Sequence, residues 1–297
     1  MNEQHLGTLL KKLREQQGLT QNELYGGLIS EATIYRLEKN KQLPNLSLLK
    51  QILHRLKISF SEFELLYTKD EDIIYMDLIE EFVSLGNTAD TEKLTNLQVK
   101  IAKQNFKENS AFLTQFFNLI TALYIYQTTQ SFETGSAIAL PVWEYTQAKE
   151  KWIFVDILLI ANAFFLFDDP LITKVFNRLI KELQPYQKLS WAQNFKITIP
   201  LNYCSYLKRK GRLTETEPYL KQIIEAIQSQ PRKDMLYYLE WKYRQAELLY
   251  FRGQEEAAGL YVQSILDTLT NTEEHLFKAD IEKDWEQFIS SDVFKCH

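Results

Sequence analysis

Glycine, proline and cysteine are scarce in this sequence. Its 297 residues include 9 Gly, 7 Pro and 2 Cys. So few helix breakers argue against an all-β fold and favour long helices with short connections. Cys204 lies in an apolar helical segment and Cys296 is the penultimate residue, so they do not form the framework of a disulfide-stapled domain, and both are expected to be reduced thiols.

Long apolar runs and catalytic motifs are missing as well. The most apolar window, residues 152–167, is interrupted by Asp156 and Asn162, whereas a membrane span needs about 20 apolar residues. We therefore expect a buried core helix there. The N-terminus lacks a basic segment followed by an apolar one, which predicts a cytoplasmic protein with no membrane segment. The four histidines are scattered, and neither a glycine-rich phosphate loop nor a Gly-x-Ser-x-Gly elbow is present. The sequence thus predicts no catalytic residue, no metal site, no cofactor and no enzyme.

The charge is distributed unevenly along the chain. The net charge of the whole chain is −5, but residues 1–66 contain 9 Lys+Arg and 7 Asp+Glu, an excess of two positive charges. The hydrophobic content of 45% can form a large core, so we expect one small and one larger domain. The small basic excess lies where contact with phosphates would need it.

Apolar residues at helical spacing predict five short helices in residues 1–66. Leucines spaced i, i+3, i+4 and i+7 from Leu6 predict a first helix that ends near Gly18. Thr20 and Glu23 form a capping-box pattern at the start of a second helix. Ser30 is expected to cap a third helix, and two further amphipathic segments complete a compact bundle.

This pattern resembles the Cro/C1-type (XRE) helix-turn-helix family across most of residues 5–66. The matching residues are Leu13-Arg14, Gly18-Leu19-Thr20-Gln21, Glu23-Leu24, Ile34, Arg36-Leu37-Glu38, Pro44 and Leu48-Leu49. The resemblance implies that Arg14 pairs with Glu38 and so ties the first helix to the recognition helix. It also implies that Gln21 touches a DNA phosphate at a helix N-terminus, where anions are favoured.

In this family the third helix enters the DNA major groove and its first turns face the base edges. Glu31 would then place an anion near the DNA, where it must accept from a cytosine amine or stay clear of the phosphates. Arg36 and Lys39 could contact phosphates or could simply lie on a solvated surface. The whole bundle could bind DNA or could be a protein-binding module. The expected DNA-binding residues are Gln21, Ser30, Glu31, Ala32, Thr33, Tyr35, Arg36 and Lys39.

The rest of the chain, residues 73–297, shows helical periodicity almost without pause and follows a charged linker, residues 67–72. Gly211 and Gly253 open similar segments 42 residues apart, longer than the roughly 34 residues of a tetratricopeptide unit. We expect an α-solenoid of degenerate tetratricopeptide-like repeats, whose concave face can hold a peptide. The predicted helices lie near 72–85, 89–104, 107–129, 133–148, 151–167, 169–184, 190–209, 215–229, 233–252, 254–270 and 272–290.

A helix-turn-helix head followed by aromatic-rich helical repeats resembles the Rgg/MutR regulators, within the wider group of peptide-pheromone sensors that includes the PlcR type. The segments 152–162 and 199–203 carry this resemblance, and each sets an asparagine in an apolar helix. An Asn amide offers a donor and an acceptor, and a buried peptide group left unpaired costs on the order of 1–3 kcal/mol. The resemblance therefore implies that Asn162 and Asn202 bind a peptide.

Tyr203 and Arg244 are further candidates for the peptide site. Each candidate has a structural alternative: a helix cap or a cross-helix bond for the asparagines, core packing for Tyr203, and an ion pair with Glu240 or Glu247 for Arg244.

Together these features predict a homodimeric regulator that binds a pseudo-palindromic site on double-stranded DNA and a short hydrophobic signalling peptide. Dimer contacts are expected mainly from the body. One alternative is a regulator whose body is only a dimerisation or protein-docking scaffold. The other is an interaction protein that never binds DNA.

Overall fold

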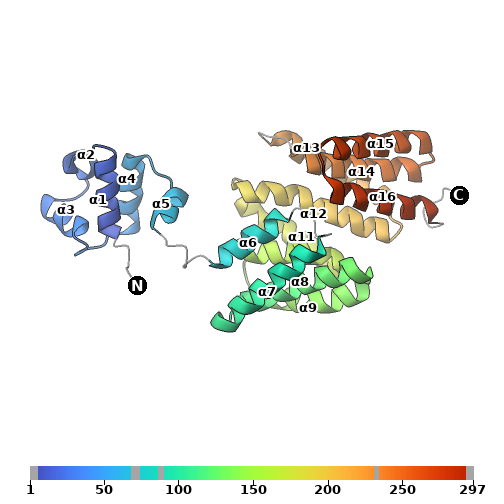
Figure 1. The fold of residues 1–297 in the computed structure, drawn as a ribbon, viewed down its shortest axis with the longest axis horizontal. Helices are drawn as coiled ribbons and strands as arrows, with labels where there is room; N and C mark the ends of the chain where they lie inside the picture. The colour runs from blue at the N-terminus through green and yellow to red at the C-terminus, as the bar shows by residue number, and fades with distance from the viewer. Residues whose placement is uncertain (1–5, 68–73, 86–89, 231–233, 292–297) are drawn as a thin grey trace. The chain divides into compact units, whose positions relative to one another are not determined.

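The computed structural model describes residues 6–67, 74–85, 90–230 and 234–291, and all regular secondary structure in these ranges is helical (Figure 1). They form sixteen α-helices and three short 3-10 helices, with no strand in the described ranges. The all-α prediction is confirmed. The chain divides into two compact units, residues 1–80 and 81–297, which we call the head unit and the body unit. The predicted linker lies outside the described residues, except for Tyr67.

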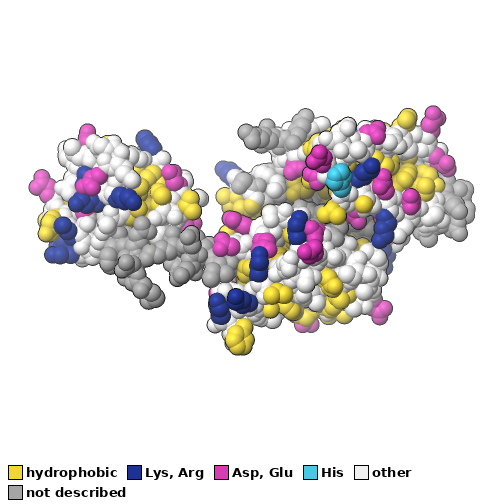
Figure 2. Space-filling view, in the orientation of Figure 1, with side chains coloured by type: hydrophobic (Ala, Val, Ile, Leu, Met, Phe, Trp, Pro, Cys, Tyr) yellow, Lys and Arg dark blue, Asp and Glu magenta, His cyan; other side chains and the backbone are white. Residues whose placement is uncertain are grey.

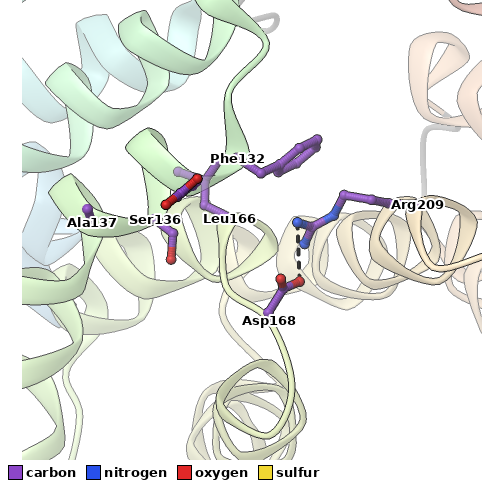
Figure 3. A pocket seen from close by; sticks show the side chains of 7 residues that line it. Phe132, Ser136, Ala137, Leu166, Asp168 and Arg209 are labelled. Atoms are coloured by element: carbon purple, nitrogen blue, oxygen red, sulfur yellow. Dashed lines mark ion pairs between the residues drawn. The ribbon is translucent and has the colours of Figure 1, made fainter.

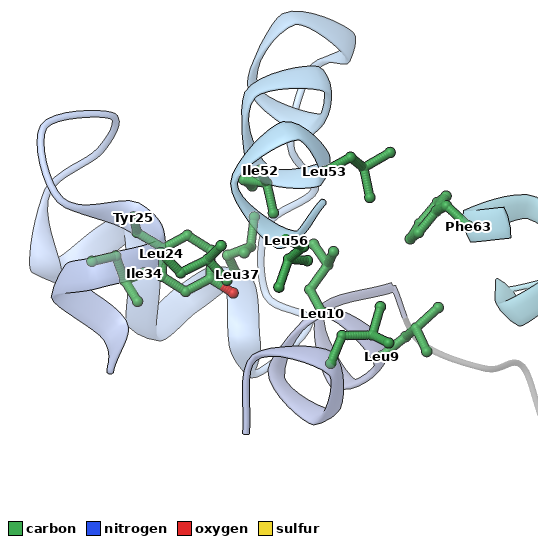
Figure 4. Packing of buried hydrophobic residues seen from close by; sticks show 11 residues of the cluster. Leu9, Leu10, Leu24, Tyr25, Ile34, Leu37, Ile52, Leu53, Leu56 and Phe63 are labelled. Carbon is green, nitrogen blue, oxygen red and sulfur yellow. The ribbon is translucent and has the colours of Figure 1, made fainter. Parts of the chain in front are cut away.

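Five short helices form the head unit together with most of α6. The buried leucines of α1 and α4, such as Leu10 and Leu56, lie together in one apolar core (Figure 4). The predicted capping box is confirmed, since Thr20 Oγ1 accepts from the backbone N–H of Glu23 at 3.2 Å and Glu23 Oε2 accepts from the N–H of Thr20 at 2.7 Å. The helices are α1 (Leu6–Gln16), α2 (Gln21–Tyr25), α3 (Glu31–Glu38), α4 (Leu46–Leu56) and α5 (Phe60–Tyr67).

Long polar side chains close the helix ends inside the head unit. Arg55 Nη1 of α4 donates to the carbonyl oxygens of Leu24, at 2.9 Å, and Gly26, at 2.8 Å, which lie at the end of α2. Gln17 Nε2 donates to the carbonyl of Leu56 at the end of α4, at 2.7 Å. Because the last carbonyls of a helix have no partner within the helix, these bonds fix where α2 and α4 end.

Eleven α-helices follow the predicted linker, close to the predicted ranges. Several boundaries differ by three or four residues, and α7, for example, ends at Glu108 against a predicted end at residue 104. The helix predicted from residue 107 begins at Ala111, because Asn109 takes a left-handed conformation with φ 49° and ends α7. The helix predicted over 151–167 is α10 followed by a 3-10 turn, Phe164–Leu166. The helices are α6 (Ile74–Ser84), α7 (Thr91–Glu108), α8 (Ala111–Thr129), α9 (Phe132–Gln147), α10 (Phe154–Ala163), α11 (Leu171–Leu183), α12 (Ser190–Arg209), α13 (Glu217–Ser229), α14 (Met235–Phe251), α15 (Glu255–Asn271) and α16 (His275–Ser290).

The body helices pair into consecutive hairpins (Figure 1): α8 with α9, α10 with α11, α12 with α13, and α14 with α15. The first helices of these hairpins, α8, α10, α12 and α14, also contact one another in series. We call this series the inner row. A stack of hairpins joined through one row of helices is the arrangement expected for degenerate helical repeats.

The 42-residue repeat has a structural counterpart. Gly211 and Gly253 each end an inner-row helix with a positive φ, 69° and 76°. The N–H of Arg212 bonds to the carbonyl of Leu207 at 2.8 Å, and the N–H of Gln254 bonds to that of Leu249 at 3.0 Å. The left-handed conformation suits glycine because it has no Cβ. The two glycines therefore make the same turn in successive repeats.

The apolar window at residues 152–167 lies in the core of the body unit. Trp152, Ile157 and Leu159 are almost fully buried, which confirms the predicted buried helix. Of the helices in the described ranges, none is long and apolar enough to cross a membrane. Cys204 is buried, and burial raises the pKa of its thiol to about 12; Cys296 lies outside the described residues.

Candidate DNA-binding surface and candidate peptide site

Helix α3 packs very closely on α1. A Cβ atom added at Gly7 would lie 1.7 Å from the carbonyl oxygen of Leu37, so only glycine allows this approach. Asn40, just after α3, accepts from the backbone N–H of Thr8 at 3.2 Å and donates to its hydroxyl at 2.7 Å. These contacts set the position of α3 against the first turn of α1.

A buried ion pair ties the same end of α3 to the C-terminal end of α1. Arg14 Nε donates to Glu38 Oε1 at 2.7 Å and Nη2 donates to Glu38 Oε2 at 3.2 Å, with side-chain exposures of 10% and 4%. Burial acts to raise the pKa of Glu38, but hydrogen bonds from Arg14 and Gln21 outweigh it and hold that pKa below its usual value. The side chain of Gln21, expected to contact a phosphate, donates to Glu38 at 2.8 Å.

The outer face of α3 is open. Glu31, Ala32, Tyr35, Arg36 and Lys39 are exposed and Thr33 is half-buried, while Ile34 and Leu37 face the core. An exposed polar face on a rigidly held helix is what insertion into a major groove requires.

Ser30 departs from its expected role. It occupies the N-cap position of α3, but its hydroxyl makes no bond to the helix backbone. Instead Ser30 Oγ and Thr33 Oγ1 are 3.0 Å apart, and Arg36 Nη2 donates to Thr33 Oγ1 at 3.3 Å. Three of the expected DNA-binding side chains are thus linked to one another.

Basic side chains from α1 and α3 flank a shallow cavity of about 210 Å³. Lys11 and Lys39 line it together with Tyr35 and the Arg14–Glu38 pair. Acidic and basic side chains are mixed over the face drawn in Figure 2. On the outer face of α3 itself, Arg36 and Lys39 are exposed together with Glu31, so close phosphate contacts would have to come from individual lysines and arginines near α3.

The two predicted asparagines lie on neighbouring helices of the inner row. Asn162 Nδ2 on α10 donates to the carbonyl of Leu158 at 2.8 Å, one turn back on the same helix. Asn202 Nδ2 on α12 donates to the carbonyl of Ala161 at 3.2 Å. Both side chains are half-buried. In the described residues no hydrogen bond uses either Oδ1 atom, so both amides retain an acceptor.

Tyr203 lies in the core of the body unit. It is 5% exposed, and its ring stacks on Phe176 with centroids 4.2 Å apart. Tyr219 packs edge-on against it. In this position Tyr203 supports α12 and offers almost no surface to a ligand.

Arg244 of α14 is surrounded by partners. Its guanidinium donates to Ser205 Oγ at 3.0 Å, to Glu240 at 2.9 Å and to Glu247 at 3.0 Å. Both ion pairs that the sequence offered as alternatives are therefore present. Burial raises the pKa of Glu240, and the neighbouring Arg244 opposes this shift.

Lys208 extends this network to the last helix. Its Nζ lies 2.5 Å from Glu247 Oε1 on α14 and 2.5 Å from Asp284 Oδ2 on α16. We call Ser205, Lys208, Glu240, Arg244, Glu247 and Asp284 the polar cluster. Its two cations face three carboxylates, so Arg244 is already neutralised locally.

Sequence analysis missed Arg209. It stacks on Phe132 at 3.9 Å, donates to the carbonyls of Phe165 and Phe167, and pairs with Asp168 at 3.3 Å. Arg209, Phe132 and Asp168 line a cavity of about 490 Å³ beside the start of α9 (Figure 3). The only signal in the sequence was spacing: Arg209 is seven residues after Asn202, on the same face of α12.

No cluster of histidine, cysteine and acidic side chains within the described ranges has the composition of a metal site. A helix-turn-helix family model matches residues 10–63. A model described as the C-terminal domain of the HTH-type transcriptional regulator Rgg matches residues 100–283. No curated protein sequence matches the chain significantly.

Solved structures with a similar fold include those of PlcR, Rgg2 and ComR. PlcR of Bacillus thuringiensis, in complex with the peptide PapR7 and DNA, is 18% identical over 93% of this chain and 98% of its own, with a TM-score of 0.70. The SHP pheromone receptor Rgg2 of Streptococcus dysgalactiae is 13% identical over 95% and 99%, with a TM-score of 0.67. ComR of S. thermophilus, in complex with DNA and its signalling peptide ComS, is 17% identical over 95% and 99%, with a TM-score of 0.63.

Proposed function

This chain belongs to the family of HTH-type transcriptional regulators Rgg, and on that basis we propose that it binds DNA under the control of a short hydrophobic signalling peptide. Residues 1–66 would be the DNA-binding domain and residues 73–297 the peptide-sensing and dimerisation domain of a cytoplasmic homodimer. The observation that carries the proposal is the exposed face of α3, held rigidly by Gly7 and by the Arg14–Glu38 pair.

Two heads in a dimer would read two half-sites of a pseudo-palindrome. Helix-turn-helix dimers bind half-sites about one helical turn apart, roughly 34 Å. Arg36 and Lys39 supply charge for the phosphates and the first turn of α3 supplies base contacts. Allosteric effectors in general change the binding free energy of a second site by about 1–3 kcal/mol, and we expect a peptide effect on DNA binding of this size.

Replacing Thr33 and Arg36 together by alanine is expected to weaken binding to the promoter fragment roughly thirtyfold or more, because two lost contacts at about 1–3 kcal/mol each sum to at least about 2 kcal/mol. Electrophoretic mobility shifts measure the loss. Lys181→Ala, which removes one positive charge from an exposed site on α11, is the control and should bind normally. Unchanged binding by the double variant would remove α3 from the mechanism.

The peptide proposal rests on the inner row. Asn162 and Asn202 lie on adjacent helices, partly exposed, each with a carbonyl oxygen available to a peptide N–H. Similar folds have been solved with bound signalling peptides. We place the peptide along this row, with the neutralised Arg244 at its border as a positioning residue.

Removing both amides, Asn162→Ala with Asn202→Ala, is expected to lower peptide affinity roughly thirtyfold or more, since two unpaired peptide groups at about 1–3 kcal/mol each cost at least about 2 kcal/mol together. Calorimetry with synthetic peptides from short reading frames beside the gene measures this. Asn194→Ala, on an exposed position of the same helix α12, is the matched control. Equal affinity in the double variant and the wild type would discard the asparagine contacts and favour a body that serves only as a scaffold.

A further inference from the structure

The first turn of α3 presents one acidic side chain that the protein itself does not use. Ser30, Thr33 and Arg36 are joined by hydrogen bonds. Glu31, at the first helical position, is exposed. In the part of the chain that the structure describes, its carboxylate has neither an ion pair nor a hydrogen bond.

A carboxylate at the leading end of a recognition helix restricts what it can meet. Ionised glutamate only accepts hydrogen bonds, and DNA phosphates repel it. Inside the major groove the donors on base edges are the amino groups of cytosine (N4) and adenine (N6). The adenine amino group lies between two acceptors, its own N7 and thymine O4, one of which would face the second carboxylate oxygen. The cytosine amino group has an acceptor, guanine O6, on one side only and C5–H on the other.

From this geometry we propose that Glu31 reads a cytosine in each half-site of the operator. The inference rests on the proposed DNA-binding function and names a base that the operator must contain. Glu31 attracts the protein to this base and repels it from sites that lack an amino donor there. Specificity arises from that difference in affinity, while Arg36 and Lys39 hold the backbone regardless of sequence.

The surrounding side chains support this role. Thr33 is already bonded to Ser30 and Arg36, so it competes less for the same base edge. Ala32, the next residue, is exposed and carries no polar group. Glu31 is therefore the side chain of the first turn whose polar atoms are fully available for a base.

The test is selection of binding sites from a random-sequence duplex library by the full-length protein, with three variants. The wild type should enrich one C·G pair at a fixed place in each half-site. Glu31→Gln should change that preference to A·T, because glutamine pairs with adenine N6 and N7. Its affinity for the wild-type site should fall roughly tenfold to a hundredfold, the usual range for one specific base contact.

Glu31→Ala should keep the rest of the motif, lose the preference at that one position and bind non-specific DNA more tightly. Glu64→Gln, which removes the same charge from an exposed site on α5, controls for charge and should select the wild-type motif. Retention of the other motif positions shows that each variant is folded. An identical motif in the wild type, Glu31→Gln and Glu31→Ala would overturn the inference and leave the DNA-binding function intact. Failure of the wild type to enrich any sequence would overturn both.

Discussion

Glu38→Gln is expected to destabilise the head unit by about 3–5 kcal/mol, the cost of leaving one charge of a buried pair uncompensated. The guanidinium of Arg14 is 10% exposed, and Glu38 provides the counter-charge, 2.7 Å from its Nε. All five tryptophans lie in the body unit, between Trp143 and Trp285. Hydrogen exchange of α1 and α3, followed by mass spectrometry, therefore measures the loss of stability in the head unit. Tryptophan fluorescence reports on the body unit and is an internal control that should not change.

Glu64→Gln supplies a matched control, because this exposed carboxylate of α5 should contribute less than about 0.5 kcal/mol. The charge of Glu38 also gives the head unit a pH dependence. Since the pKa of Glu38 is lowered in the folded protein, its stabilisation is complete above the unfolded pKa, about 4.3, and is lost as the pH falls through the folded value. The difference between wild type and variant should therefore shrink in acid. A constant difference down to pH 2 would contradict this account.

Gly7→Ala should separate α1 from α3 and weaken both folding and DNA binding. The added methyl group would meet the carbonyl oxygen of Leu37 at 1.7 Å, and a backbone atom cannot turn away as a side chain does. Overpacking a tight contact costs typically 1–3 kcal/mol, occasionally more, and we expect the upper end. Hydrogen exchange in the head and mobility shifts on a promoter fragment measure the two effects.

Gly259→Ala is the matched control for this substitution. Gly259 lies in α15, is exposed, and has no atom within 4 Å of an added Cβ. Alanine in a helix interior is favoured over glycine by about 0.8–1.0 kcal/mol, so this variant should stabilise the body unit. Equal stability of Gly7→Ala and the wild type would show that α3 can move away from α1 at no cost.

The helices could be predicted from the sequence because their signals are local. The capping box of Thr20 and Glu23 spans three residues, and the turns at Gly211 and Gly253 need only a left-handed residue. The Arg14–Glu38 pair joins residues 24 positions apart. The family resemblance predicted this pair, whereas hydrophobic periodicity cannot predict a contact between two helices.

The polar side chains of the body were harder to interpret. Arg244 has partners on its own helix and on α12, and Lys208 reaches Asp284, 76 residues away. Such contacts depend on how the hairpins stack. Asn162 shows the same limit, since no sequence pattern indicates that its amide donates to Leu158 one turn back. Sequence placed the asparagines on helices but did not show which of their atoms remain available.

The ion pairs of Lys208 make the C-terminal part of the body unit, from α12 to α16, stiffer than the hairpins before it. In a stack of hairpins each repeat contacts only the repeats next to it, so bending is distributed along the whole stack. Lys208 is bonded at once to α14 and α16, which clamps three helices into one block. Bending of the stack must then be concentrated in the hairpins before α12. A ligand bound between α10 and α12 would therefore have its largest effect on the shape of the body unit there.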